Sequence, residues 1–407
     1  MSNIWIVSEH YYPCGNTTSY LITRISEGLA GYAPVNVITT TAHGSAEEMI
    51  NGVKIYRTRD SFLDKNKFSQ RIFKLLLLSF RLIWKSARLI KRNDVVLVVT
   101  NPAPIIFLMG ILKKFKGFRL CFLAHDLFPE NLVIAGVVKN TNPIYKTTLR
   151  LFNYAYRRAD RIIVIGRDME KTMKGKIRGS DAIIRYIPNF ADVDFIRPMP
   201  KETNEMANKL GLTGKFVILF TGNIGRAQDI ENILKAMKLL KEQPHIHLLM
   251  IGEGAKFKTA RDLIKKYNLE NVTLLDSIDR TWSNDFLNAG DAGLVSLQPG
   301  RKGIGIPSKT YTYLAAGKPI IGVVDRDSEV EMLIRETNCG WWIEPGDPQK
   351  TAELFRKISE SDEVKSRAAI ARSVAESGYS IQSTIPLFHD LIKEVSYEGR
   401  KQSLVQG

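Results

Sequence analysis

Short apolar runs alternate with longer amphipathic stretches along almost the whole chain. In the first half, runs typical of buried strands cover residues 3–8, 35–39, 53–58, 94–100, 118–124, 161–166 and 183–188. Helices are predicted between them, chiefly at 17–30, 68–92, 104–115 and 143–158. Continuous β-branched runs such as 94–100 are typical of parallel strands that are buried on both faces. This alternation therefore predicts a parallel sheet covered by helices on both sides.

The second half repeats the pattern, and the chain ends in a long helical tail. Strands are predicted at 215–222, 246–252, 272–276, 291–297, 319–324 and 340–344, with helices between them and a wholly helical segment over 348–397. Prolines bracket an irregular stretch at 187–198, where we place the join. The expected fold is α/β, with two facing Rossmann-like domains at 1–195 and 196–379. A C-terminal helix, 380–407, is expected to pack back on the N-terminal domain.

Composition agrees with a two-domain globular protein. The chain has 407 residues, 44% of them hydrophobic, which suits two domains of roughly 190 residues better than one core. Its three cysteines lie far apart and have no metal-ligand spacing, so a reduced, cytosolic setting is expected. The N-terminus does not have the pattern of a signal peptide, and no apolar stretch is long enough to predict a transmembrane span.

The formal charge of +16 is concentrated in one part of the sequence. One acid, Asp94, lies among twelve basic residues: Lys67, Arg71, Lys74, Arg81, Lys85, Arg88, Lys91, Arg92, Lys113, Lys114, Lys116 and Arg119. Four of them (74, 81, 85 and 88) share one face of the predicted helix 68–92, whose other positions are largely apolar. Such a helix can lie on an anionic membrane, with Lys113, Lys114 and Lys116 adding charge, or it can be a core helix with a solvated basic stripe.

Two loops of the first half follow predicted strands and carry candidate site residues. Gly15 and Asn16 precede Thr17, a plausible helix N-cap, and backbone N–H groups at such a helix start can hold an anion. An empty capped turn explains the same residues. His125 follows the strand at 118–124 and could bond a sugar hydroxyl or transfer a proton, although a lone histidine is more often structural.

Glycine-rich turns carry the strongest signals of the second half. The strand at 215–222 runs into Gly222-Asn223, then Arg226 and Gln228, and a helix. Glycines let the backbone approach a ligand closely, and Arg226 would favour a diphosphate. A shorter turn after the strand at 246–252 holds Gly252 and Gly254; alone it fits a plain turn equally well.

A second glycine-rich loop, with Gly303 and Gly305, leads into Ser308 as the predicted N-cap and Lys309 in the first turn of a helix. A lysine is electrostatically unfavourable at a helix start unless an anion is bound there. We therefore expect an anion at this position, although an ordinary capped helix remains the alternative.

Taken together, these motifs resemble the retaining glycosyltransferases of family four, which have the GT-B fold. The resemblance covers nearly the whole chain and is carried by YYPCGN, HDLFPE, IPNFADVDFIRP, TGNIGRAQDIENI, GEG and PSKTYTYLAAGKPII. Within the family, these motif sequences are similar to those of bacterial O-antigen and capsule enzymes. The motifs of N-acetyl-L-fucosamine transferases and colanic-acid-type transferases are the most similar.

The resemblance implies roles for several residues. Gly15 would lie near the donor phosphates, and His125 would touch the transferred sugar. The loop from Gly222 to Gln228 and the Ser308–Lys309 helix start would hold the diphosphate. Many family members carry two glutamates eight residues apart, the second of which binds ribose. Here the second position is Thr312, so ribose recognition departs from the pattern.

The resemblance implies a metal-independent, retaining hexosyl or N-acetylhexosaminyl transferase without cofactors. The expected donor is a nucleotide diphosphate sugar, with UDP favoured on family grounds, and the expected acceptor is a saccharide on a lipid pyrophosphate. We expect a cytoplasmic enzyme that is peripheral on the inner face of the plasma membrane and that binds no nucleic acid. A nucleotide-sugar 2-epimerase and a non-catalytic membrane scaffold of a polysaccharide assembly complex remain alternatives.

Overall fold

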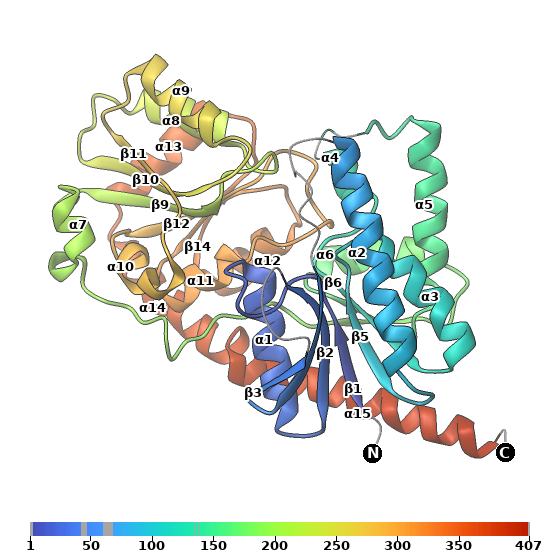
Figure 1. Ribbon diagram of the computed structural model, residues 1–407. Coiled ribbons are helices and arrows are strands. Elements are labelled where there is room, and N and C mark those ends of the chain that lie inside the picture. Colours follow the sequence, from blue (N-terminus) through green and yellow to red (C-terminus); the bar gives the residue numbers. More distant parts are fainter. Residues whose placement is uncertain (1–2, 42–46, 60–67, 135, 137, 406–407) are drawn as a thin grey trace. The chain divides into compact units, whose positions relative to one another are not determined.

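The computed structural model describes residues 3–41, 47–59, 68–134, 136 and 138–405 (Figure 1). The chain forms two compact units. Unit 1 comprises Met1–Pro188 together with Thr384–Gly407, and unit 2 comprises Asn189–Ser383. Each unit is built on its own sheet, and each is described by itself below.

The sheet of unit 1 has eight strands in the order β3-β4-β2-β1-β5-β6-β7-β8. They are β1 (Ile4–Val7), β2 (Val35–Thr41), β3 (Glu47–Ile50), β4 (Val53–Arg59), β5 (Val95–Val99), β6 (Arg119–Ala124), β7 (Arg161–Val164) and β8 (Ile183–Tyr186). All neighbouring pairs are parallel except β3 with β4. Every residue of the central strands β1 and β5 is buried, which explains their continuous apolar runs.

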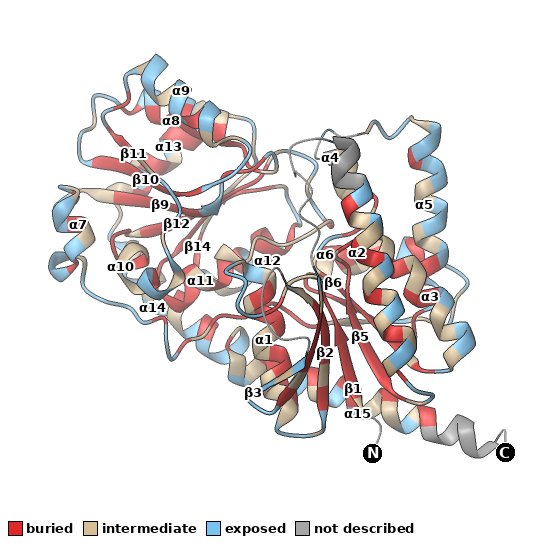
Figure 2. Cartoon of the chain, viewed as in Figure 1, coloured by how far each residue is buried: buried red, intermediate tan, exposed pale blue. Residues whose placement is uncertain are grey.

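Helices pack against both faces of this sheet. They are α1 (Thr17–Ala30), α2 (Phe68–Leu89), α3 (Pro104–Lys116), α4 (Glu130–Ile134), α5 (Pro143–Tyr156) and α6 (Arg167–Lys176). Their sheet-facing sides are buried and their other sides are exposed or intermediate (Figure 2). At the start of α1 the cap is Asn16, whose side chain accepts a hydrogen bond from Ser19 N at 2.8 Å, and not Thr17 as predicted. The amide oxygen reaches this N–H from outside the helix.

Unit 2 has a six-stranded, wholly parallel sheet in the order β11-β10-β9-β12-β13-β14. Its strands are β9 (Phe216–Asn223), β10 (Ile246–Glu253), β11 (Val272–Leu275), β12 (Ala292–Ser296), β13 (Ile320–Val323) and β14 (Gly340–Ile343). Its α-helices are α7 (Glu205–Lys209), α8 (Ile230–Leu239), α9 (Phe257–Tyr267), α10 (Ser283–Asn288), α11 (Lys309–Ala315), α12 (Glu329–Thr337), α13 (Pro348–Ser359) and α14 (Glu363–Gly378). Two apolar clusters, one on each side of the sheet, form its core.

The last helix, α15 (Ile381–Val405), packs on unit 1. Buried Arg161 donates to Glu394 at 2.7 Å and to Glu398 at 2.6 Å, and the ring of His389 stacks on Tyr32 with centroids 4.0 Å apart. Residues 189–195 pack with unit 2, where Ala191 N donates to the Tyr379 carbonyl at 2.9 Å. The change of unit therefore comes at residues 188–189, somewhat before the predicted boundary.

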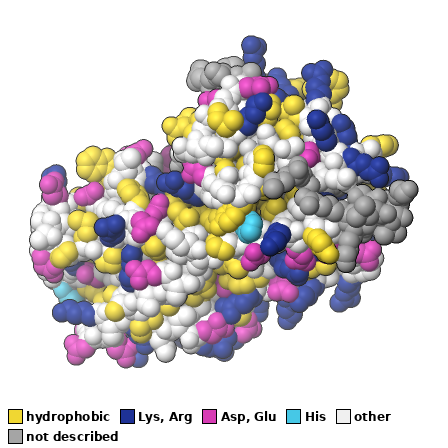
Figure 3. Space-filling model, turned by 90° about the horizontal axis from the view of Figure 1, so that it is seen from below, with side chains coloured by type: hydrophobic (Ala, Val, Ile, Leu, Met, Phe, Trp, Pro, Cys, Tyr) yellow, Lys and Arg dark blue, Asp and Glu magenta, His cyan; other side chains and the backbone are white. Residues whose placement is uncertain are grey.

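The α/β prediction with two Rossmann-like domains is confirmed. Strand β3 was not predicted because it is a four-residue edge strand in which Glu47 and Met49 are exposed. The predicted helical tail consists of three helices, α13, α14 and α15. Lys and Arg side chains are spread among acidic and hydrophobic ones on the face of the molecule drawn in Figure 3. No described helix has the length and hydropathy needed to cross a membrane.

Candidate functional site

The loops after β9 and β10 lie side by side at the carboxyl edge of the unit 2 sheet, where parallel sheets bind ligands. Gly222 pairs with Gly252, and Asn223 with Glu253. Gly222 has φ +90°, a conformation that favours glycine, and a Cβ added to it would meet nothing within 4 Å. Gly222 and Asn223 are both exposed. This part of the turn is thus open to an approaching ligand.

Gly252 and Gly254 serve a different purpose, which is close packing between the two loops. A Cβ on Gly252 would lie 1.8 Å from the Gly222 carbonyl oxygen, and one on Gly254 would lie 2.4 Å from Asn223 Oδ1. Any side chain at either position would push the loops apart. Their contribution is therefore the shape of the turn.

Of the other polar residues in the β9 loop, one stabilises the turn and one is exposed to solvent. The Gln228 side chain is buried, and its Oε1 accepts a hydrogen bond from Gly225 N at 2.9 Å, so it holds the turn together. Arg226 is exposed and can reach an anion in solution.

The Lys309 ammonium group is the most unusual feature of this region. Its Nζ is buried without a hydrogen-bond partner and lies 3.4 Å from the centroid of the Phe220 ring. Burial in this environment lowers the pKa of Lys309 to about 7. A cation held this way next to β9 is ready to receive a negative charge, because nothing described around it supplies one.

Two other buried hydroxyl groups of unit 2 also lack partners. Ser296 ends β12, the strand beside β9, and Thr310 follows Lys309; both are buried, and neither hydroxyl has a hydrogen-bond partner. By contrast, the Tyr313 hydroxyl bonds Thr221 N at 2.8 Å and so anchors α11 to β9. Sequence reasoning missed Ser296 and Thr310. The position of Ser296 at the end of a buried strand was the available signal.

Three further residues that were predicted to bind the nucleotide-sugar donor lie at or near the start of α11. Gly305 and Ser308 are half-buried. Ser308 does not act as the predicted side-chain cap, because its backbone is already helical and its hydroxyl makes no capping hydrogen bond. Thr312 Oγ1 bonds the Ser308 carbonyl at 3.4 Å. The structure thus groups the predicted unit 2 residues along β9, β10 and α11.

The predicted residues of unit 1 lie in loops after β1 and β6. His125 directly follows β6; its Nε2 is buried without a partner, and desolvation lowers its pKa to about 4, so the imidazole is neutral near pH 7. Gly15 has open space around its Cβ position. The Asn16 side chain caps α1 and donates to Cys14 Sγ at 3.1 Å, so its polar atoms are already used locally.

Most of the predicted membrane-binding residues of α2 and α3 are buried or half-buried, although Arg88 and Lys114 are exposed. Lys74 is 9% exposed, and Lys85 Nζ donates to the Arg57 carbonyl at 3.0 Å. Arg81 donates to the Arg59 carbonyl at 2.7 Å. On α3, Lys113 pairs with Asp160 at 2.8 Å, while Lys114 is exposed and Lys116 half-buried. These side chains flank the sheet, and a different set of α2 residues points outward.

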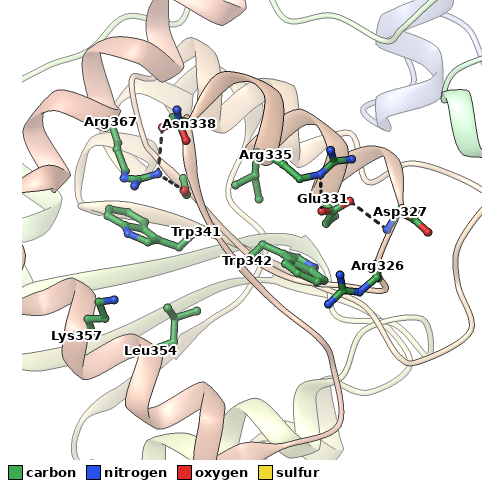
Figure 4. Close-up of a pocket in the computed structure, with 12 residues that line it drawn as sticks. Arg326, Asp327, Glu331, Arg335, Asn338, Trp341, Trp342, Leu354, Lys357 and Arg367 are labelled. Atoms are coloured by element: carbon green, nitrogen blue, oxygen red, sulfur yellow. Dashed lines mark hydrogen bonds and ion pairs between the residues drawn. The ribbon is translucent and has the colours of Figure 1, made fainter.

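An open pocket of about 660 Å³ lies along edge strand β14 and contains none of the predicted residues. Trp341 and Trp342 line it, each with an arginine over its ring: Arg367 at 4.7 Å and Arg326 at 5.2 Å (Figure 4). Another of its cations is engaged by an acid, as Arg335 Nε donates to Glu331 at 3.0 Å. The three arginines of this pocket therefore already have aromatic or acidic partners. Among the described residues, no group of His, Cys, Asp and Glu is suited to hold a metal ion.

Comparison with known proteins agrees with this geometry. Family models match residues 21–195, described as Glycosyltransferase Family 4, and residues 202–376, described as Glycosyl transferases group 1. The probable glycosyltransferase WbjE of Pseudomonas aeruginosa is 34% identical, over 98% of this chain and 100% of its own length. The putative colanic acid biosynthesis glycosyl transferase WcaI of Escherichia coli is 26% identical over 66% of each chain.

A solved structure has the same fold at low identity. Anabaena Alr3699/HepE in complex with UDP-glucose superimposes with a TM-score of 0.71 at 15% identity, covering 98% of this chain and 100% of that one. The family 4 match lies in the first half of the chain and the group 1 match in the second, as the two sheets do. The chain belongs to the glycosyltransferases of the GT-B fold.

Proposed function

We propose that this enzyme transfers a sugar from a UDP-sugar donor to a lipid-linked saccharide during O-antigen or capsule biosynthesis, with retention of configuration and without a metal. N-acetyl-L-fucosamine or another N-acetylated hexose is the proposed sugar. The relative WcaI, named for colanic acid biosynthesis, supports a role in polysaccharide biosynthesis. The HepE complex with UDP-glucose supports UDP as the nucleotide of the donor. The enzyme would act at the inner face of the plasma membrane, where lipid-linked acceptors are exposed to the cytoplasm.

The observation that carries the donor site is the buried Lys309 ammonium without a counter-charge. Negative charge grows on the diphosphate as the bond from sugar to oxygen breaks, and a fixed cation stabilises it most in a site of low dielectric. Exposed Arg226 adds a second cation from the β9 loop, and Gly222 leaves room for the ligand.

Retention would follow if the acceptor hydroxyl attacks on the face that the diphosphate leaves. The leaving diphosphate then takes the proton from the acceptor, and no enzymic nucleophile is required. His125, neutral at physiological pH, would exchange hydrogen bonds with a sugar hydroxyl and so orient the ring. Exclusion of water from the site would limit hydrolysis of the donor.

A thermal-shift screen of the full chain against UDP, GDP, ADP and TDP, with and without magnesium, tests this proposal. We expect UDP alone to raise the unfolding temperature, independently of magnesium, and the shift to disappear in Lys309→Ala. Stabilisation by a different nucleotide would reassign the donor. No shift with any nucleotide would refute the donor site and favour a non-catalytic scaffold instead.

A further inference from the structure

Helix α2 exposes an apolar face in addition to the one that it buries. Phe73, Leu76, Phe80 and Trp84, the apolar stripe of α2, are spaced 3, 4 and 4 residues apart and therefore lie on one side of the helix. Their exposures are 60%, 54%, 59% and 54%. The opposite side, with Leu78 and Leu82, is fully buried. A helix that is apolar on both sides is typical of one whose outer face has an apolar partner.

Neighbouring helices extend this apolar surface. Helix α3 packs against α2, and α5 packs against α3, on the same side of the unit 1 sheet (Figure 1). Phe115 of α3 is 80% exposed, and α5 exposes Ile144 and Leu151. Exposed large apolar side chains in this number, on three helices that pack one against the next, favour a binding face.

A cationic pocket of about 350 Å³ lies beside the stripe, between the end of β4 and α2. It is lined by Arg57, Thr58, Arg59, Arg81, Trp84, Lys85, Arg88 and Leu89, and none of these described residues is acidic. Lys85 of α2 donates a hydrogen bond to the Arg57 carbonyl, and Arg81 of α2 donates one to the Arg59 carbonyl. These bonds hold both side chains against β4. Such a cluster of donors suits the oxygens of a phosphate group.

Trp84 belongs both to the stripe and to the pocket lining, and the Arg88 guanidinium lies 4.7 Å from its ring. When the stripe enters the acyl region of a bilayer, the pocket comes to the level of the headgroups, where tryptophan and arginine side chains are favoured. We propose that unit 1 docks on an anionic lipid bilayer through the apolar stripe of α2, and that the cationic pocket receives a lipid phosphate. This inference rests on the membrane location in the proposed function, and not on the transfer reaction itself.

The charges select a lipid surface over other partners. A second copy of the chain, docked by the same face, would bring its own Arg59, Arg81, Lys85 and Arg88 toward this pocket, whereas Arg57 is already paired with Glu48. Like charges at short distance oppose such an association. A nucleic acid would satisfy the pocket but leave the apolar stripe uncovered. An anionic bilayer satisfies both, through its phosphates and its acyl chains.

Co-sedimentation of the full chain with vesicles tests the proposal. We expect strong binding to phosphatidylcholine vesicles containing anionic phosphatidylglycerol and weak binding to phosphatidylcholine alone. Phe80→Ser/Trp84→Ser should abolish most of the binding, whereas Trp282→Ser, which removes a 59% exposed tryptophan of unit 2, should not. Arg59→Gln/Arg88→Gln should weaken partitioning roughly 25-fold, at about fivefold per charge, and the matched pair Lys235→Gln/Lys238→Gln on α8 should have no effect.

Two further readouts separate docking from misfolding and from donor binding. In the wild type, brominated lipids should quench tryptophan fluorescence; Trp84→Phe should still bind vesicles but lose that quenching. UDP protection of Arg59→Gln/Arg88→Gln should equal that of the wild type, so a failed donor site and a failed membrane site give different results. Equal binding by the stripe variant, or stabilisation by inorganic phosphate without any vesicle binding, would overturn the proposal.

Discussion

Replacing Lys309 by methionine should make the protein more stable and at the same time unable to recognise the donor. The substitution keeps a long unbranched side chain in the pocket beside Phe220 but removes the buried charge. Lowering the lysine pKa from 10.5 to about 7 corresponds to roughly 4 kcal/mol of destabilisation at pH 7. The gain expected for Lys309→Met is therefore about 4 kcal/mol.

The pH dependence of this effect has a definite sign. The folded-state pKa lies below that of the unfolded chain, so the unfolded state holds the proton more tightly between about pH 7 and 10.5. The destabilisation by Lys309 is complete below about pH 7 and disappears as the pH rises toward 10.5. Stability of the wild type should consequently rise across this window, and the contribution should be missing from Lys309→Met.

Thermal unfolding with and without UDP measures both consequences. For a unit of this size, about 4 kcal/mol raises the unfolding temperature by roughly 8–16 °C. UDP should protect the wild type but not the variant. Lys318→Met is the matched control, because Lys318 is also buried and desolvation lowers its pKa to about 8. Lys318 lies just before β13, at the amino-terminal ends of the strands and away from the proposed donor site. UDP protection should persist in it. A destabilised Lys309→Met that still binds UDP would refute the reasoning.

Four other outcomes test further residues of the proposed function. UDP binding at pH 8 should take up close to one proton as Lys309 becomes charged, measured by calorimetry in buffers of different ionisation enthalpy; an uptake of zero would contradict its pKa of about 7. His125→Ala should lower kcat roughly 100-fold. In the wild type, kcat should show no transition near pH 6.5 because the histidine pKa is about 4. Gly252→Ala should destabilise unit 2 by about 3 kcal/mol in urea unfolding, since its Cβ would meet the Gly222 carbonyl, whereas Gly15→Ala should be nearly neutral.

The sequence was sufficient for most of the fold because the central strands are buried on both faces. Continuous apolar runs such as 94–100 and 215–222 have no other stable environment, and they became β5 and β9. Edge strand β3 has exposed glutamates and little apolar character, so its pairing depends on β4 rather than on its own composition.

The candidate site could be predicted only where a residue was unusual for its position in the chain. Lys309 at a helix start was such a case, whereas the buried hydroxyls of Ser296 and Thr310 become notable only once their surroundings are known. The sequence alone also could not predict which side of α2 faces outward. Basic and apolar stripes both run along it, and packing against β4 and α3 decides that Phe80 points outward and Lys74 does not.

Ala191 donates a hydrogen bond to the Tyr379 carbonyl and forms a parallel bridge with Ser380. These contacts affect how unit 2 is connected to the rest of the chain. The two ends of unit 2 are held together, so this domain is an insertion whose entry and exit share one point. A gene fragment encoding residues 189–383 should therefore yield a self-contained folded domain. A domain connected in this way can be exchanged between proteins as a single piece while the rest of the chain is retained.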